Sequence, residues 1–135
     1  MRAAAPLAVL VAALVASTAA LGAGSSTTSL RVTYWEDGAV TSKSVTWTLR
    51  CDPASGSLAR PVRACTRLAA GGVKLFGPLR KDMVCTEIYG GPQRARVVGT
   101  VDGKRVWATF TRRDGCEIDR WQRISPWLVP PGGVT

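Results

Sequence analysis

The chain contains no histidine among its 135 residues. Ser-His-Asp and Cys-His catalysis both need an imidazole as general base, so both are excluded. The four cysteines show no C-x2-C spacing, and without histidine the sequence predicts no metal site. The acidic residues show no spacing typical of a carboxylate pair or a metal-carboxylate site. We therefore predict that the chain is not an enzyme and uses no cofactor.

Long apolar runs are absent after the first 23 residues. The N-terminal run, Pro6 to Val15, follows Arg2 and precedes a stretch rich in small residues, Ser17 to Ala23. This pattern is typical of a secretion signal, and the run is too short to span a bilayer stably. We therefore predict a signal peptide over residues 1–23 and a single mature domain over residues 24–135. The mature protein should be secreted and extracellular, without a membrane segment.

Acidic residues are half as frequent as basic ones. The 18 Lys and Arg residues against 9 Asp and Glu give a net charge of +9, which becomes +8 when Arg2 leaves with the signal. Such charge suits an anionic partner. The basic residues are scattered, however, and only Arg112, Arg113, Arg120 and Arg123 form a dense group. Because no nucleic-acid-binding signature accompanies them, we interpret the charge as a solubility feature and predict no nucleic-acid partner.

Strand signals dominate the rest of the chain. Apolar and polar residues alternate over Leu30–Trp35 and again over Ser44–Cys51, and the short connection between the two runs favours an antiparallel pair. A second hairpin is predicted from Arg94–Val101 and Lys104–Thr111, joined by the turn signal Asp102-Gly103.

Helix signals are fewer. Pro61 can begin a helix that runs from Val62 to Ala70 and ends at Gly71-Gly72, and Cys116–Gln122 suggests a short second helix. An edge strand over Ile124–Val129 completes the order. We therefore predict an α+β fold: an antiparallel sheet of about five strands, with one main helix and a short second helix on one face. The even number of cysteines predicts two disulfides.

The segment from Met83 to Pro92 combines a cysteine, four residues that can lie extended, and a Gly90-Gly91-Pro92 stop. Held at both ends, such a segment forms a taut exposed loop, as in protease inhibitors that offer a peptide already shaped as substrate. The alternative is an ordinary surface loop anchored by a disulfide, which many secreted domains contain.

Several motifs, in order, resemble the Streptomyces subtilisin inhibitors, which are secreted serine-protease inhibitors. The resemblance covers about Leu30 to Val129, with all four cysteines in register. The motifs are Thr46-x-Thr48-Leu49-x-Cys51, Ala64-Cys65-x-x-Leu68-Ala69-Ala70-x-Gly72, Asp82-Met83-Val84-Cys85-x-x-Ile88-Tyr89-x-x-Pro92, Val101-Asp102-Gly103-Lys104-Arg105-Val106 and Cys116-Glu117-Ile118-Asp119.

The resemblance implies the disulfides Cys51–Cys65 and Cys85–Cys116. It also implies a reactive loop in which the bond presented to a protease is Glu87-Ile88, with Glu87 at P1. The loop residues from P4 to P2′ are then Val84, Cys85, Thr86, Glu87, Ile88 and Tyr89. Such inhibitors bind like a substrate and are cleaved slowly and reversibly.

The chain departs from the family at two loop positions. Thr86 stands where proline is common, and its β-branched side chain still favours extended backbone. Glu87 stands where well-known members carry Met or Lys. A carboxylate in an apolar S1 pocket loses its hydration without gaining a partner. We therefore expect the partner to be an extracellular serine protease of the subtilisin-like or glutamate-specific kind.

Two further expectations concern other surfaces. The family implies a homodimer through the outer face of the sheet, and strand alternation places Trp35 and Trp107 on that face, opposite Val106, Ala108 and Phe110. The alternative function is a secreted binding module on the same scaffold that recognises an anionic polymer or a non-protease partner.

Overall fold

The structure is a computed structural model that describes residue 4 and residues 27–132. Apart from residue 4, the expected signal peptide lies outside the described residues. Four strands form one antiparallel sheet in the order β2-β1-β3-β4. They are β1 (Ser29–Trp35), β2 (Val45–Arg50), β3 (Arg94–Val101) and β4 (Lys104–Phe110). The other elements are α1 (Pro61–Gly71), the 3-10 helix η1 (Gly72–Phe76) and α2 (Gly115–Ile124).

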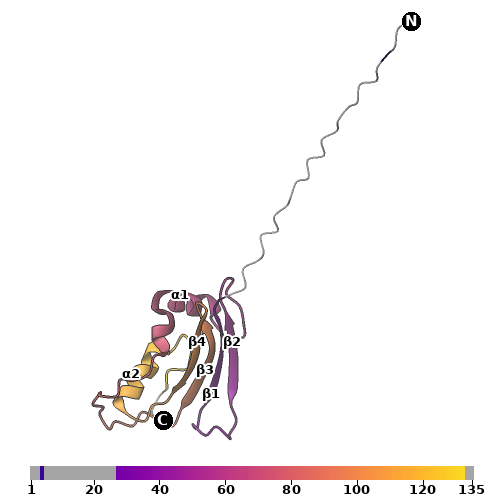
Figure 1. Cartoon of the computed structure of the whole chain (residues 1–135). Coiled ribbons are helices and arrows are strands. Elements are labelled where there is room, and N and C mark those ends of the chain that lie inside the picture. The colour runs from indigo at the N-terminus through magenta and orange to yellow at the C-terminus, as the bar shows by residue number, and fades with distance from the viewer. Residues whose placement is uncertain (1–3, 5–26, 133–135) are drawn as a thin grey trace.

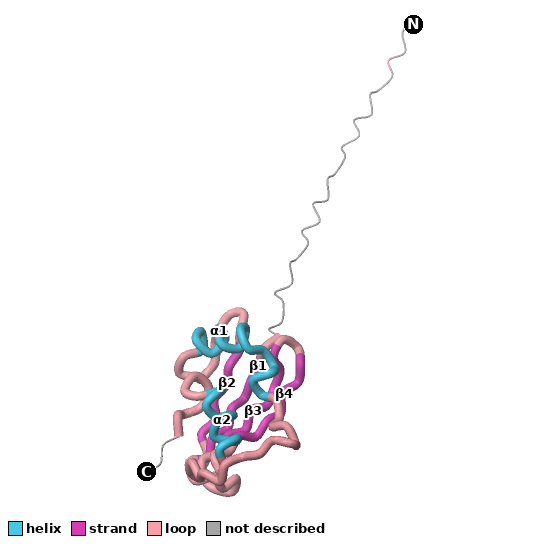
Figure 2. Tube along the Cα trace, turned by 90° about the vertical axis from the view of Figure 1, so that its left-hand side faces the viewer, coloured by secondary structure: helices cyan, strands magenta, loops and turns pink. Residues whose placement is uncertain are grey.

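Both helices lie on one face of the sheet, and no helix among residues 27–132 covers the opposite face (Figure 1). Turning the molecule by 90° brings α1 and α2 in front of the strands (Figure 2). Inward-facing strand residues such as Leu49, Val97 and Phe110 are fully buried beneath them. This confirms the α+β class and the helices on one face, with four strands in place of about five. No helix within residues 27–132 is long and apolar enough to cross a membrane.

Both predicted hairpins form. In the β3–β4 turn, Asp102 has φ 49° and Gly103 has φ 75°. Two consecutive residues with positive φ match the twist of an antiparallel pair, which is why Asp-Gly is a strong hairpin signal.

The predicted edge strand over Ile124–Val129 is wrong. The backbone N–H groups of Leu128 and Val129 donate to the carbonyl oxygen of Ile124 at 2.9 and 3.3 Å, so the chain turns back at the end of α2. Trp127, Leu128 and Val129 are buried in the core cluster. The apolar character of this segment therefore reflects packing under the helices and not strand pairing.

Trp35 lies on the outer face of the sheet, as alternation predicts, but it is not exposed there. Its side chain is only 7% exposed, whereas that of Trp107 is 77% exposed. The guanidinium carbon of Arg96, on the neighbouring strand β3, lies 5.7 Å from the centre of a Trp35 ring. This is a cation–π geometry, and it leaves Trp107 as the large aromatic exposed on the outer face.

Candidate reactive-loop site

The chain from Met83 to Pro92 forms no helix or strand. Its apolar side chains point into solvent: Val84 is 96% exposed, Ile88 62% and Tyr89 60%. Apolar side chains gathered on one exposed loop are typical of a surface that a partner covers.

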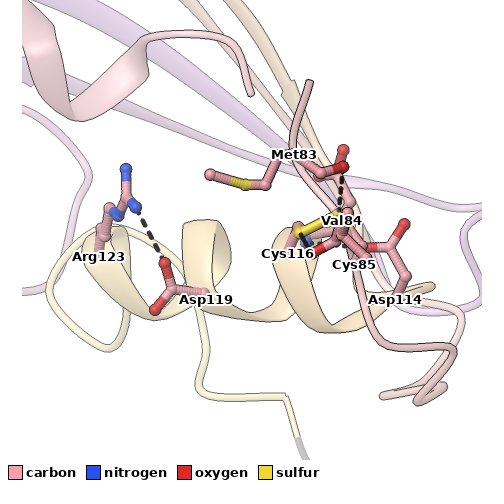
Figure 3. The surroundings of a disulfide bond; sticks show 8 residues. Met83, Val84, Cys85, Asp114, Cys116, Asp119 and Arg123 are labelled. Carbon is pink, nitrogen blue, oxygen red and sulfur yellow. Dashed lines mark hydrogen bonds and ion pairs between the residues drawn. A yellow bond between two sulfur atoms is a disulfide. The ribbon is translucent and has the colours of Figure 1, made fainter. Parts of the chain in front are cut away.

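The loop is fixed at its first end to the start of α2. Cys85 and Cys116 form a disulfide with their Cα atoms 5.3 Å apart, which ties the loop to the first turn of the helix (Figure 3). The N–H of Gly115 donates to the carbonyl oxygen of Thr86 at 2.9 Å. Asp114 caps the same helix by accepting a hydrogen bond from the Glu117 N–H at 2.9 Å. The loop residues before the Glu87-Ile88 bond are therefore held by a capped helix terminus.

The loop is fixed at its second end by Arg112. The N–H of Gly90 donates to the Arg112 carbonyl oxygen at 2.7 Å. In return, the Arg112 guanidinium donates to the Gly90 carbonyl oxygen and, at 3.2 Å, to Oε1 of Gln93. Both Gly90 and Gln93 are buried.

Between these two fixed ends lie Glu87, Ile88 and Tyr89. Within the described part of the chain, none of the three forms a hydrogen bond or an ion pair. All three are exposed. The segment without internal hydrogen bonds is thus three residues long and includes the Glu87-Ile88 bond.

Glycines allow the close contact at both ends. A Cβ on Gly115 would overlap Oγ1 of Thr86, so a side chain there would force Thr86 to shift. A Cβ on Gly90 would lie 2.8 Å from Cδ1 of Ile118 and 3.0 Å from the Arg112 carbonyl oxygen. Both distances are too short for ordinary packing.

A buried arginine fixes the chain upstream of the loop. Arg120, on α2, donates to the carbonyl oxygens of Gly77 at 3.0 Å and Thr109 at 2.6 Å. Its guanidinium carbon lies 4.1 Å from the centre of the Phe110 ring. Burial lowers the pKa of this guanidinium, while the nearby charge of Glu117 acts in the opposite direction. Arg120 thereby joins α2, β4 and the end of η1 into one support.

The dense basic group seen in the sequence is exposed only in part, at Arg113 and Arg123. Arg112 holds the loop, Arg120 is buried, and Arg123 pairs with Asp119 at 2.9 Å. Sequence reasoning did not assign the supporting roles of Arg112, Gly115 and Arg120. The position of Gly115 next to Cys116 was a usable signal. A residue beside a disulfide-bonded cysteine lies close to the segment that carries the partner cysteine.

The remaining disulfide, Cys51–Cys65, joins the end of β2 to α1. Both bridges have the pairing that the family resemblance implies. Within the described residues, one group of possible metal ligands comes together: Cys85, Asp114 and Cys116. Both of its sulfur atoms are used in the disulfide, so the group offers one carboxylate and fits no metal site.

Fold and loop define a small disulfide-linked α+β domain that presents an extended segment held at both ends. Residues 25–112 match the subtilisin inhibitor-like family, and the chain belongs to this family. Among solved structures, the fold is similar to that of Streptomyces caespitosus sermetstatin, crystallised in complex with Bacillus licheniformis subtilisin. The two chains share 24% identity and a TM-score of 0.50, over 75% of this chain and 96% of the other. Comparison with curated protein sequences gave no match.

Proposed function

We propose that the chain is a secreted standard-mechanism serine-protease inhibitor that presents the Glu87-Ile88 bond. Its family membership and its similarity to an inhibitor bound to subtilisin support a serine-protease inhibitor function. The observation that carries the assignment of the bond is the pair of fixed ends. Thr86 is held by Gly115 and the adjacent disulfide, and Gly90 is held by Arg112, which leaves Glu87-Ile88-Tyr89 free between them.

These contacts explain why a protease would hold the loop without consuming it. The loop is ordered before binding, so association loses little conformational entropy. If the Glu87-Ile88 bond is cut, both new ends stay attached to the same body. The new amine then remains beside the acyl group, where its high effective concentration favours resynthesis of the bond over hydrolysis.

The side chains around the bond support a partner with an open, apolar cleft. In the proposed alignment Val84 lies at P4, Cys85 at P3, Thr86 at P2, Ile88 at P1′ and Tyr89 at P2′. Val84 is almost fully exposed and can fill an apolar S4 pocket. Oγ1 of Thr86 lies close to Gly115, while Thr86 as a whole stays exposed at P2.

Glu87 at P1 determines which proteases are suitable. An S1 pocket with hydrogen-bond donors or positive charge would accept its carboxylate, as in a glutamate-specific endopeptidase. A trypsin-like S1 pocket carries negative charge and would repel it. A subtilisin-like S1 pocket is open enough to accept Glu87 with some loss of affinity. We therefore propose subtilisin-like or glutamate-specific proteases as targets.

Inhibition constants for Glu87→Met and Glu87→Lys test this proposal. Against a subtilisin, a glutamate-specific protease and trypsin, Met should improve subtilisin binding by ~1–3 kcal/mol, and Lys should create trypsin inhibition. Asp82→Lys is the matched control, because it makes the same charge change five residues earlier in an exposed ion pair. Constants left unchanged by both Glu87 substitutions would show that Glu87 is not P1. Equal trypsin inhibition by the Asp82 variant would attribute the gain to overall charge.

Export and dimerisation belong to the same proposal. Two disulfides suit a protein that folds in an oxidising compartment, which supports secretion. The homodimer through the outer sheet face stays a prediction.

A further inference from the structure

The sheet register brings five arginines to the face opposite α1 and α2. Each occupies a strand position opposite in orientation to the buried core positions. None of the nine acidic residues lies in a strand, and all nine lie in the described part of the chain. We call this surface the arginine face; its charged members are Arg31, Arg50, Arg94, Arg96 and Arg105.

The pairing of the strands places the exposed Trp107 within this charged surface. One row across the sheet runs Thr48, Arg31, Val98, Trp107. With neighbouring strands about 4.8 Å apart, Arg31 and Trp107 lie about 10 Å from each other, separated by Val98. The adjacent row ends in Arg50 on β2 and Arg105 on β4. The indole of Trp107 thus has cationic side chains along its own strand and across the sheet.

The arginine face is not neutralised by the protein itself. Within residues 27–132 none of its five guanidinium groups forms an ion pair or a side-chain hydrogen bond. Arg96 is held over the Trp35 ring, which orders it before any partner arrives. Arg31, Arg50 and Arg105 are exposed, so their N–H donors are available to an anionic ligand.

We propose that the arginine face binds single-stranded nucleic acid. Guanidinium groups recognise phosphates through paired N–H donors, and exposed aromatic rings stack on unpaired bases. A phosphate polymer without bases offers no ring to stack on Trp107. In a duplex the bases are already stacked on one another, so they are not available to Trp107 either. A second copy of the chain would place five arginines against five, so it would occupy this face only where salt screens their repulsion. The sequence-based prediction of no nucleic-acid partner rested on spacing along the chain, which does not show this grouping across the strands.

Binding of a fluorescent 20-nucleotide oligo(dT) to the full chain tests the proposal, with anisotropy measured over a range of salt concentrations. Replacing Arg31, Arg50 and Arg105 by Gln should weaken binding and make the slope of log affinity against log salt shallower by about 2. Arg60, Arg63 and Arg67→Gln is the matched control: it removes the same charge on the helix side, and its affinity should stay closer to that of the parent. Trp107→Ala should lower affinity about tenfold or more, and Trp107→Phe should retain most of it.

Competition distinguishes this ligand from other polyanions. Unlabelled oligo(dT) should displace the probe at lower phosphate concentration than polyphosphate or duplex DNA of equal length. Equal competition by polyphosphate, or full affinity in Trp107→Ala, would overturn the nucleic-acid assignment. Equal losses in the two triple-arginine variants would overturn the assignment of the face. Binding of phosphatidylglycerol vesicles that depends on Trp107, without binding of oligo(dT), would identify the face as a lipid surface and reject the proposal.

Discussion

The backbone N–H of Gly115 donates a hydrogen bond of 2.9 Å to the carbonyl oxygen of Thr86, the residue immediately before the proposed P1. Gly115 is the first residue of α2, and its neighbour Cys116 carries the disulfide to Cys85. The helix terminus therefore supports the loop twice within two residues, once by a covalent bond and once by a hydrogen bond. The rigidity of the loop depends on how closely the two backbones approach.

Gly115→Ala should disrupt this approach, because the new methyl group would overlap the Thr86 side chain. We expect a stability loss of about 1–3 kcal/mol from overpacking, and inhibition weakened about ten- to hundredfold by misplacement of the loop. Thermal unfolding and inhibition constants measure the two effects. Gly77→Ala is the control, since the nearest atom to its added Cβ would be 3.4 Å away. Unchanged inhibition in the Gly115 variant would show that the helix terminus does not position the loop for inhibition.

Arg112→Ala should loosen the other end of the loop. The Gly90 carbonyl oxygen is buried and would lose its guanidinium donor, at a cost of about 1–3 kcal/mol. Cleavage of the loop by the target protease should become faster, because the two new ends would separate more readily. Gel analysis of inhibitor incubated with protease measures this rate. Arg113→Ala, which removes the same charge next to it, should leave the rate unchanged; an equal increase there would assign the effect to charge.

Removing the Cys85–Cys116 disulfide by double substitution to Ala should turn the inhibitor into a substrate. Its 31-residue separation corresponds to about 3.5–4 kcal/mol in the chain-entropy view. The Cys51–Cys65 bridge, with a separation of 14 residues, corresponds to about 3 kcal/mol. Both double variants should therefore unfold at lower temperature.

Only the Cys85–Cys116 variant should be cleaved quickly, when assayed below its unfolding temperature, because only that bridge touches the loop. Equal cleavage of both double variants would show that lost stability alone opens the loop.

The elements with clear alternation or turn chemistry were predictable from the sequence. Strand Arg94–Val101 was predicted with the bounds that the structure has, since Asp102-Gly103 ends it sharply. The family resemblance implied both disulfide pairs. Ile124–Val129 was misassigned because a short apolar run does not distinguish a strand from a buried turn.

Tertiary contacts decided the features that the sequence did not reveal. Trp35 occupies the orientation expected from alternation, but Arg96 on another strand covers it. The arginine face depends on register between strands up to 74 residues apart, such as Arg31 and Arg105, and scattered spacing along the chain hides it. The support given by Arg112 to Gly90 likewise spans 22 residues and follows from no local pattern.

The predicted homodimer through the outer sheet face should depend on salt. Exposed Trp107 favours contact between two copies, whereas facing arginines repel one another. Because the screening length falls from about 10 Å at 0.1 M to about 3 Å at 1 M, repulsion weakens as salt is added. Light scattering at micromolar concentration should therefore show a mass that rises toward the dimer between these two conditions.

Trp107→Ser should remain monomeric throughout, and Arg31, Arg50 and Arg105→Gln should dimerise at lower salt. A monomer mass at every salt concentration would reject the dimer, and a dimer unaffected by Trp107→Ser would place the interface elsewhere. Single-stranded DNA should compete with dimerisation, since both would occupy the arginine face.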